Sequence, residues 1–170
     1  VAKLRVATEE IPFRWMTGTQ SHEGIAGTMA AIEHLAWIGR ECSGDNRLPR
    51  REALTRAFSA IEEHERALCL RMIEGLKEVE GIKIWGITDP KRVSERSPTV
   101  SFTHPKMEAA EIGRMLADMG VFVWAGNFYA LELTEALGLE PEGVLRAGVL
   151  HYNTMGEVER FVSSVSNILE

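Results

Sequence analysis

Apolar residues recur at helical spacing through the first half of the chain. The spacing predicts a first helix, capped by Thr19 or Ser21, whose apolar side carries Ile25, Met29, Ile32, Ala36 and Gly39. The polar stretch "SGDNRLP" has the composition of a loop. A longer helix is predicted after Pro49, with a buried stripe of Leu54, Phe58, Ile61, Leu68, Met72 and Leu76. Two long helices therefore open the chain.

After Gly81 the period changes from helical to alternating. Alternating or continuously apolar runs predict strands at residues 82–86, 99–103, 121–126 and 144–152. Helices are predicted at residues 108–119, from residue 127 to Gly138, and after a capping box formed by Thr154 and Glu157. The last helix would bury Val158, Phe161, Val165 and Ile168 or Leu169.

This order predicts an α+β fold, in which helices cover one face of a small sheet that two long helices precede. The chain has 170 residues, of which 45% are hydrophobic and 26% charged, as expected for a globular protein with a real core. The net charge of −6 argues against nucleic-acid binding, and no apolar run reaches the roughly 20 residues of a membrane span. Cys42 and Cys69 match neither a metal-site nor a disulfide spacing, which indicates a reduced, cytoplasmic protein.

The stretch "VLRAGVLHYNT" contains one charge, Arg146, inside an apolar strand. Alternation puts Leu145, Ala147 and Val149 on one face, and Arg146 with Gly148 on the other. A charge on a sheet must be solvated or paired. Two interpretations are open: an internal ion pair with an acidic residue, or an anchor for a substrate carboxylate.

Two loops also carry candidate chemistry. "TGTQSHEG" at a helix start suits an anion such as phosphate, but the same residues suit an ordinary helix cap. "WAGNFYA" follows a strand and is either a site loop or a hydrophobic turn. The five histidines form no metal-binding pattern, and nucleophile-elbow, dinucleotide-binding and P-loop motifs are absent from the sequence. No self-contained active site and no metal site are predicted.

Several stretches together resemble a known family: "WMTGTQSHEGIAGTMAAIEHL", "TVSFT", "VFVWAGNFYA" and "RAGVLHYNTMGEVERF". In order and spacing they resemble the C-terminal portion of class V aminotransferases, the pyridoxal-phosphate fold that includes cysteine desulfurases. The subgroup of cysteine desulfurase-like proteins is the most similar. The resemblance implies that residues 1–48 form the end of a large cofactor domain and an interdomain helix, and residues 49–170 a small C-terminal α/β domain.

The resemblance also implies roles for individual residues. Arg146 would bind the α-carboxylate of an amino-acid substrate, and Asn127 and Tyr129 would shape the substrate pocket. Thr19 would contact the cofactor phosphate across a homodimer interface, with its neighbour Gln20 as a second candidate.

The sequence departs from the family's pattern at three places. Tyr129 stands where true desulfurases carry a sulfur-accepting cysteine, and Trp124 where an arginine is often found. The Schiff-base lysine of the family lies upstream of the "GT" turn, and Lys3 matches a later lysine. No catalytic residue is therefore expected in this chain, and pyridoxal phosphate would be held with a missing N-terminal domain.

Three functions follow as expectations. The first is the substrate-recognition portion of an enzyme that acts on an amino acid by transamination or β-elimination. The second is a stand-alone, non-catalytic α+β module that binds a ligand or partner. The third is a fragment of a cysteine desulfurase or selenocysteine lyase. Without the cofactor domain, the first helix would expose apolar surface and promote self-association.

Overall fold

Two helices dominate the first part of the chain. In the computed structural model, which describes residues 5–16 and 18–169, α1 spans His22–Ser43 and α2 spans Arg50–Glu78. A short 3-10 helix, η1, precedes them at Phe13–Trp15. The chain divides into two units, one ending at Ser59 and one beginning at Ala60. The expected domain boundary at residue 48 concerns a larger enzyme and stays a prediction.

The start and end of α1 follow from its terminal residues. The hydroxyl of Ser21 accepts a hydrogen bond from the Gly24 N–H at 3.3 Å, which confirms Ser21 as the cap. Gly44, with φ +70°, ends the helix in the left-handed conformation that glycine adopts without steric cost.

Small residues make the contact between α1 and the first turns of α2. Ala36, Ala53 and Ala57 are fully buried, and a Cβ on Gly39 would lie only 1.8 Å from the Ala53 carbonyl oxygen. The backbones therefore approach too closely for any side chain at position 39. The predicted burial of Phe58 is wrong, because the alanines fill this contact and Phe58 is 58% exposed.

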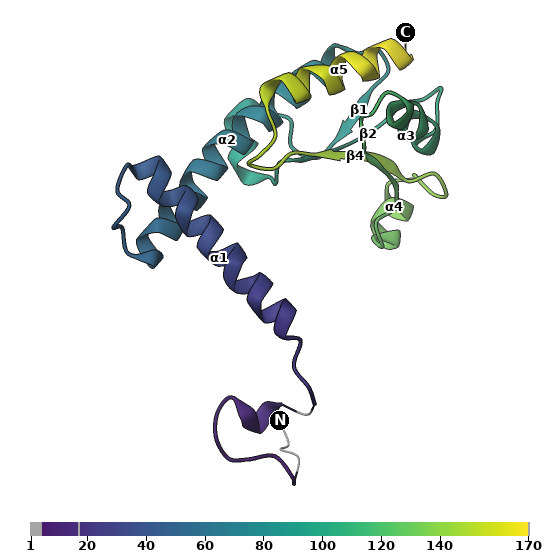
Figure 1. Cartoon of the computed structure of the whole chain (residues 1–170). Coiled ribbons are helices and arrows are strands. Elements are labelled where there is room, and N and C mark those ends of the chain that lie inside the picture. The colour runs from purple at the N-terminus through teal and green to yellow at the C-terminus, as the bar shows by residue number, and fades with distance from the viewer. Residues whose placement is uncertain (1–4, 17, 170) are drawn as a thin grey trace. The chain divides into compact units, whose positions relative to one another are not determined.

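The second unit contains a four-stranded antiparallel sheet with the order β1-β2-β4-β3. Figure 1 labels β1, β2 and β4 of this sheet. The strands are β1 (Lys83–Trp85), β2 (Thr99–Thr103), β3 (Trp124–Gly126) and β4 (Val144–Gly148). Both edge strands are three residues long. The predicted strand at 121–126 is shortened, because pairing with β4 begins only at Trp124.

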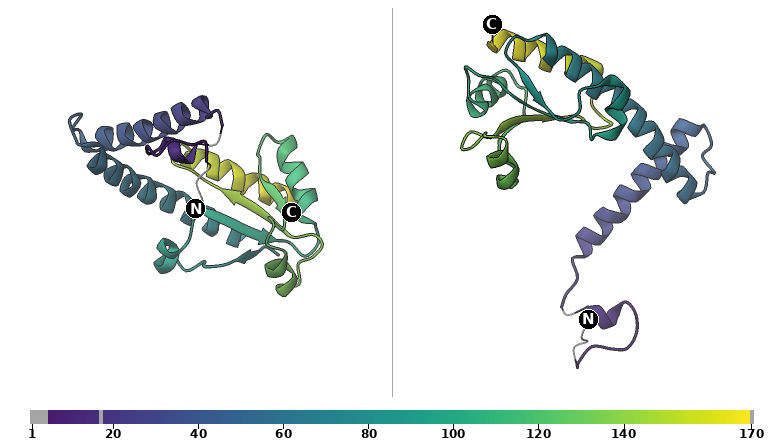
Figure 2. Two further views of the ribbon diagram at one scale, coloured as in Figure 1. Left: turned by 90° about the horizontal axis from the view of Figure 1, so that it is seen from below. Right: turned by 180° about the vertical axis from the view of Figure 1, so that it is seen from behind.

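Helices α2, α3 (Ala109–Asp118) and α5 (Met155–Leu169) supply the core on one face of this sheet (Figure 1). The sheet contributes Val100, Phe102, Leu145 and Ala147 to that core, and the helices contribute Leu68, Met72, Leu76, Ile112, Leu116, Val158, Phe161 and Val165. The predicted α+β class is confirmed. The short helix α4 (Leu131–Ala136) lies on the other side of the sheet from α5 in both figures of the whole chain (Figures 1 and 2).

The β1–β2 connection contains a 3-10 helix, η2 (Pro90–Glu95), where the sequence predicted only a polar loop. Asp89 caps it by accepting a hydrogen bond from the Lys91 N–H. The Arg96 guanidinium then donates to the backbone carbonyls of Ile87 and Thr99, so one side chain holds both ends of the connection.

The predicted capping box of α5 is confirmed. The Thr154 N–H donates to the Glu157 carboxylate at 2.7 Å, and the Glu157 N–H donates to the Thr154 hydroxyl at 3.3 Å. These bonds from Thr154 lower the pKa of Glu157. The turn before the helix is closed by Asn153, whose side-chain oxygen accepts from the Leu150 N–H at 2.8 Å. The "HYNT" segment thus fixes how β4 leads into α5.

Candidate functional site

Burial alternates along β4 as its sequence predicts. Leu145, Ala147 and Val149 are buried on the helix-covered face, whereas Arg146 and Gly148 are exposed on the opposite face. We call this second side of the sheet the open face. It carries the only charge of β4, so the candidate site lies on the side away from the core.

The strand register places Arg146 in a row of side chains that crosses the open face. Trp85 pairs with Ser101, Ser101 with Arg146, and Arg146 with Trp124. Directly paired residues of antiparallel strands project from the same face, with Cβ atoms about 4.5–5.5 Å apart. Trp124 is 70% exposed, so a large indole surface stands free next to the guanidinium.

The Arg146 guanidinium stacks on an aromatic ring instead of pairing with a carboxylate. Its Cζ lies 3.7 Å from the centre of the Phe128 ring, a cation–π contact. Across residues 5–16 and 18–169, no carboxylate lies within ion-pair distance of Arg146. The described structure therefore does not support the internal ion pair.

The loop that carries Phe128 has an unusual backbone. Phe128 and Tyr129 have φ values of +56° and +62°, which residues other than glycine rarely adopt. The Asn127 side-chain oxygen accepts a hydrogen bond from the Tyr129 N–H at 3.2 Å, and the Asn127 carbonyl accepts from the Ala130 N–H at 2.9 Å. Asn127 therefore stabilises the turn, and the Tyr129 side chain is fully exposed.

The predicted phosphate contacts lie in the other unit, in the turn before α1. Thr19 is exposed, and its hydroxyl is a donor of the kind that phosphate oxygens accept. The Gln20 side-chain amide donates to the Gly18 carbonyl at 3.0 Å, which engages one of its two N–H groups in the local turn. The roles of Thr19 and Gln20 at a phosphate stay predictions. Lys3 and Thr17 lie outside the described residues.

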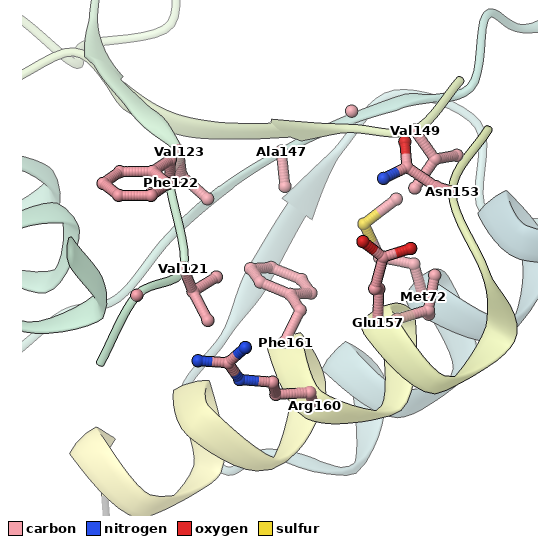
Figure 3. A pocket seen from close by; sticks show the side chains of 13 residues that line it. Met72, Val121, Phe122, Val123, Ala147, Val149, Asn153, Glu157, Arg160 and Phe161 are labelled. Atoms are coloured by element: carbon pink, nitrogen blue, oxygen red, sulfur yellow. The ribbon is translucent and has the colours of Figure 1, made fainter. Parts of the chain in front are cut away.

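A cavity of the second unit lies on the opposite side of β4 from Arg146. It encloses about 260 Å³ between β4, the segment before β3, and α5. Figure 3 shows Ala147, Phe161 and Met72 among the apolar side chains around it, with Glu157 and Arg160 at its polar side. Alternation along β4 thus separates this cavity from the guanidinium, and the candidate site is an open surface.

Other kinds of site find little support in the part of the chain that is described. Residues 5–16 and 18–169 contain no group of three side chains suited to hold a metal ion. No helix among the same residues is long and apolar enough to cross a membrane. Cys42 and Cys69 are both free thiols, and Cys69 is buried.

Comparison with known proteins places the chain in a family. The sequence model of the family described as aminotransferase class-V matches residues 2–161. The chain belongs to the class-V aminotransferase family.

Members of the class-V family with similar sequences are named as desulfurases and as aminotransferase-like proteins. "Probable cysteine desulfurase 2" of Mycobacterium leprae is 33% identical over 94% of this chain and 32% of its own length. An aminotransferase-like protein of Gibberella zeae is 34% identical over 66% of this chain and 28% of its own length. The chain thus spans about a third of the length of the curated relatives it matches.

Solved structures of this class-V family share the fold. The apo structure of a cysteine desulfurase from Thermococcus onnurineus matches with a TM-score of 0.72 and 26% identity, over 93% of this chain and 34% of that one. A cysteine desulfurase from Escherichia coli, described as its S-sulfonic acid, matches with a TM-score of 0.71 and 25% identity, over 95% and 34% of the two chains.

Sequence reasoning missed Phe128, although it singled out Asn127 and Tyr129 on either side. The sequence gives little sign of this contact, because the Phe128 ring meets Arg146 in a loop where Phe128 and Tyr129 both have positive φ, and no sequence pattern predicts that backbone. The pairing of Trp124 with Arg146 also required the β3–β4 register. Both aromatic side chains become part of the candidate site only in the folded chain.

Proposed function

We propose that this chain is the C-terminal, substrate-recognition portion of a pyridoxal-phosphate enzyme of the class-V family that acts on an amino acid. Arg146 would hold the α-carboxylate of the substrate. The observation that carries this role is the exposed guanidinium on the open face, stacked on Phe128 and not paired with any carboxylate of the described residues. Its N–H donors match the two oxygens of a carboxylate.

The cofactor, when bound, would supply the electron sink for bonds broken at the amino-acid α-carbon. The exposed Thr19 hydroxyl would donate to its phosphate, in the proposed homodimer across the subunit interface. We assign the Schiff-base lysine to the part of the enzyme that corresponds to the other two-thirds of the relatives' length. In this proposal the present chain binds and orients the substrate and performs no chemical step alone.

Transamination or β-elimination is favoured over desulfuration by the chemistry of Tyr129. A sulfur-accepting cysteine works as a thiolate that takes up sulfur as a persulfide, and a phenol forms no such species. Tyr129 stands exposed at the loop position where the thiol is expected. Sulfide release from cysteine by the full-length enzyme, if it persisted after removal of Cys42 and Cys69, would favour the desulfurase or selenocysteine lyase instead.

The proposal also includes a homodimer in the cytoplasm. Apolar residues of α1 that the fold leaves exposed support an interface with the rest of the enzyme: Ile25 is 53% exposed, Met29 59% and Ile32 39%. The free thiols Cys42 and Cys69 agree with a reducing compartment. A stand-alone binding module, the alternative, would stay strictly monomeric in sedimentation at high protein concentration.

The test is substitution of Arg146 in the full-length enzyme. Arg146→Ala removes the fork of donors, and Arg146→Lys keeps the charge but loses its two-point geometry. We expect Arg146→Ala to raise the KM for the amino acid by about 10- to 100-fold, as for the loss of a charged hydrogen-bonding partner. The visible absorbance of the bound cofactor should not change.

Arg114→Ala is the matched control, because Arg114 is a surface arginine of the same unit whose side chain donates to the Ala110 carbonyl of its own helix. It should leave the KM unaltered. A KM for Arg146→Ala equal to that of the parent enzyme would remove Arg146 from the substrate site.

A further inference from the structure

We propose that the open-face site selects carboxylates that carry a large apolar side chain, with Trp124 as the specificity-determining residue and Phe128 as the positioning residue for Arg146. This inference rests on the proposed function, because it takes Arg146 to be the carboxylate anchor. It adds the class of substrate, which neither the family nor the similarity to the relatives defines.

The contact with Phe128 orients Arg146 without consuming its hydrogen-bonding capacity. A guanidinium is planar, and all five of its N–H donors lie in that plane. Arg146 Cζ lies 3.7 Å from the centre of the Phe128 ring, a cation–π contact that engages none of the N–H donors in a conventional hydrogen bond. The edge that would bind a carboxylate therefore remains available.

The Phe128 ring is presented by a loop that the structure holds in a costly conformation. Positive φ values at two consecutive residues with side chains persist only where the surroundings stabilise them. Two hydrogen bonds to Asn127, from the N–H groups of Tyr129 and Ala130, supply part of that support. The ring and the guanidinium are thus ordered before any ligand arrives, which reduces the entropic cost of binding.

Trp124 sets what can lie beside a bound carboxylate. It is the direct β3 partner of Arg146, so the two side chains leave the same face one strand apart. The indole is 70% exposed. A carboxylate that binds Arg146 brings its substituent close to this surface, and an apolar substituent would remove both surfaces from water.

The other neighbours of Arg146 in its row offer no comparable partner. Ser101, on the β2 side, is small and half-buried. Lys83 on β1 lies on the same face, and its ammonium is 3.7 Å from the centre of the Trp85 ring. If a substrate bound to Arg146 carried an acidic side chain, that side chain would lie against the Trp124 indole. It would have to span two strands to reach Lys83 on β1.

The experiment is a titration of the full-length enzyme, isotope-labelled at arginine and tryptophan, followed by NMR at the Arg146 side-chain N–H and the Trp124 indole N–H. The probes are acetate, L-alanine, L-leucine, L-phenylalanine and L-glutamate. We expect L-phenylalanine to bind about tenfold more tightly than L-alanine, the discrimination typical of an apolar contact. L-leucine should fall between them.

Variants assign the effect to individual residues. Trp124→Ala should bring the ratio of L-phenylalanine to L-alanine affinity close to one while L-alanine affinity stays the same. Phe128→Leu should weaken all carboxylates by a similar factor, leave that ratio unchanged, and remove the ring-current shift of the Arg146 signal. Phe58→Ala, which removes an exposed aromatic ring from α2, is the control and should change nothing.

The outcomes separate this inference from the proposed function. If no probe moves the Arg146 signal, the carboxylate anchor itself is wrong. If every carboxylate binds equally, the anchor stands and the apolar selectivity is refuted. Tightest binding of L-glutamate would also refute it and would point to Lys83 as the second contact.

Discussion

The close contact at Gly39 gives the most sharply defined prediction for stability. A Cβ at this position would lie 1.8 Å from the Ala53 carbonyl oxygen, 2.6 Å from its carbonyl carbon and 3.0 Å from the Ala57 nitrogen. Carbon–oxygen contacts in proteins are normally about 3.3–3.6 Å. Gly39→Ala would therefore force the two helices apart by roughly 1.5 Å at this point, because a backbone carbonyl of a helix cannot rotate away.

Two opposing terms set the change in free energy of unfolding that Gly39→Ala causes. Overpacking of a tight contact costs about 1–3 kcal/mol. Replacing glycine by alanine inside a helix returns about 1 kcal/mol through backbone propensity. We expect Gly39→Ala to destabilise the contact between α1 and α2 by up to about 2 kcal/mol. Gly27→Ala, in the same helix with no atom within 4 Å of the added Cβ, should instead stabilise α1 by up to about 1 kcal/mol.

Amide hydrogen exchange resolved along α1 measures both effects. A loss of 1.4 kcal/mol appears as a tenfold lower protection, so the two variants should shift α1 amides in opposite directions. If Gly39→Ala raised protection as Gly27→Ala does, the helices would not approach as closely as described.

Three further predictions concern the second unit. Gly75→Ala should destabilise the fold by up to about 2 kcal/mol after the gain in helix propensity, since its Cβ would lie 2.6 Å from a methyl of Val162, and Val162→Ala should partly rescue it in a urea-unfolding cycle. The hydrogen bond from Arg71 lowers the pKa of Glu159 in the folded chain, so the pair stabilises the fold fully above the ordinary glutamate pKa of about 4.3 and loses this effect as pH falls through the lowered pKa. In urea unfolding, the free energies of unfolding of Arg71→Met and the parent should therefore converge in acid. A difference that stays constant with pH would contradict this. Desolvation raises the pKa of the buried Cys69 thiol, and iodoacetamide should label it, by mass spectrometry, only in urea; rapid labelling of the native chain would contradict its burial.

Patterns that depend on neighbours in sequence predicted much of the fold. The alternation around Arg146 placed its side chain on the correct face, and Thr154 with Glu157 correctly marked the start of α5. The error at Phe58 has a different origin. A pattern of large apolar residues assumes that size decides burial, whereas Gly39 lets the backbones approach until only alanines fit between them.

The candidate site was predictable only in part for a similar reason. Arg146 stands out in the sequence because a charge interrupts an apolar strand. Its actual partners depend on the β3–β4 register and on the backbone of the loop at Phe128, which no local pattern encodes. Sequence alone therefore left the ion pair open as an alternative, and the fold provided the stacked ring.

The brevity of both edge strands bears on how this chain would aggregate. A long exposed edge is a template on which further strands add and grow into fibrils. Here β1 and β3 each offer three residues, and β1 begins with the charged Lys83. Apolar side chains on α1 and near Trp124 can still make copies of the chain adhere. Such aggregates would form through side-chain surfaces, without a cross-β core, and should dissolve on dilution without seeding further growth.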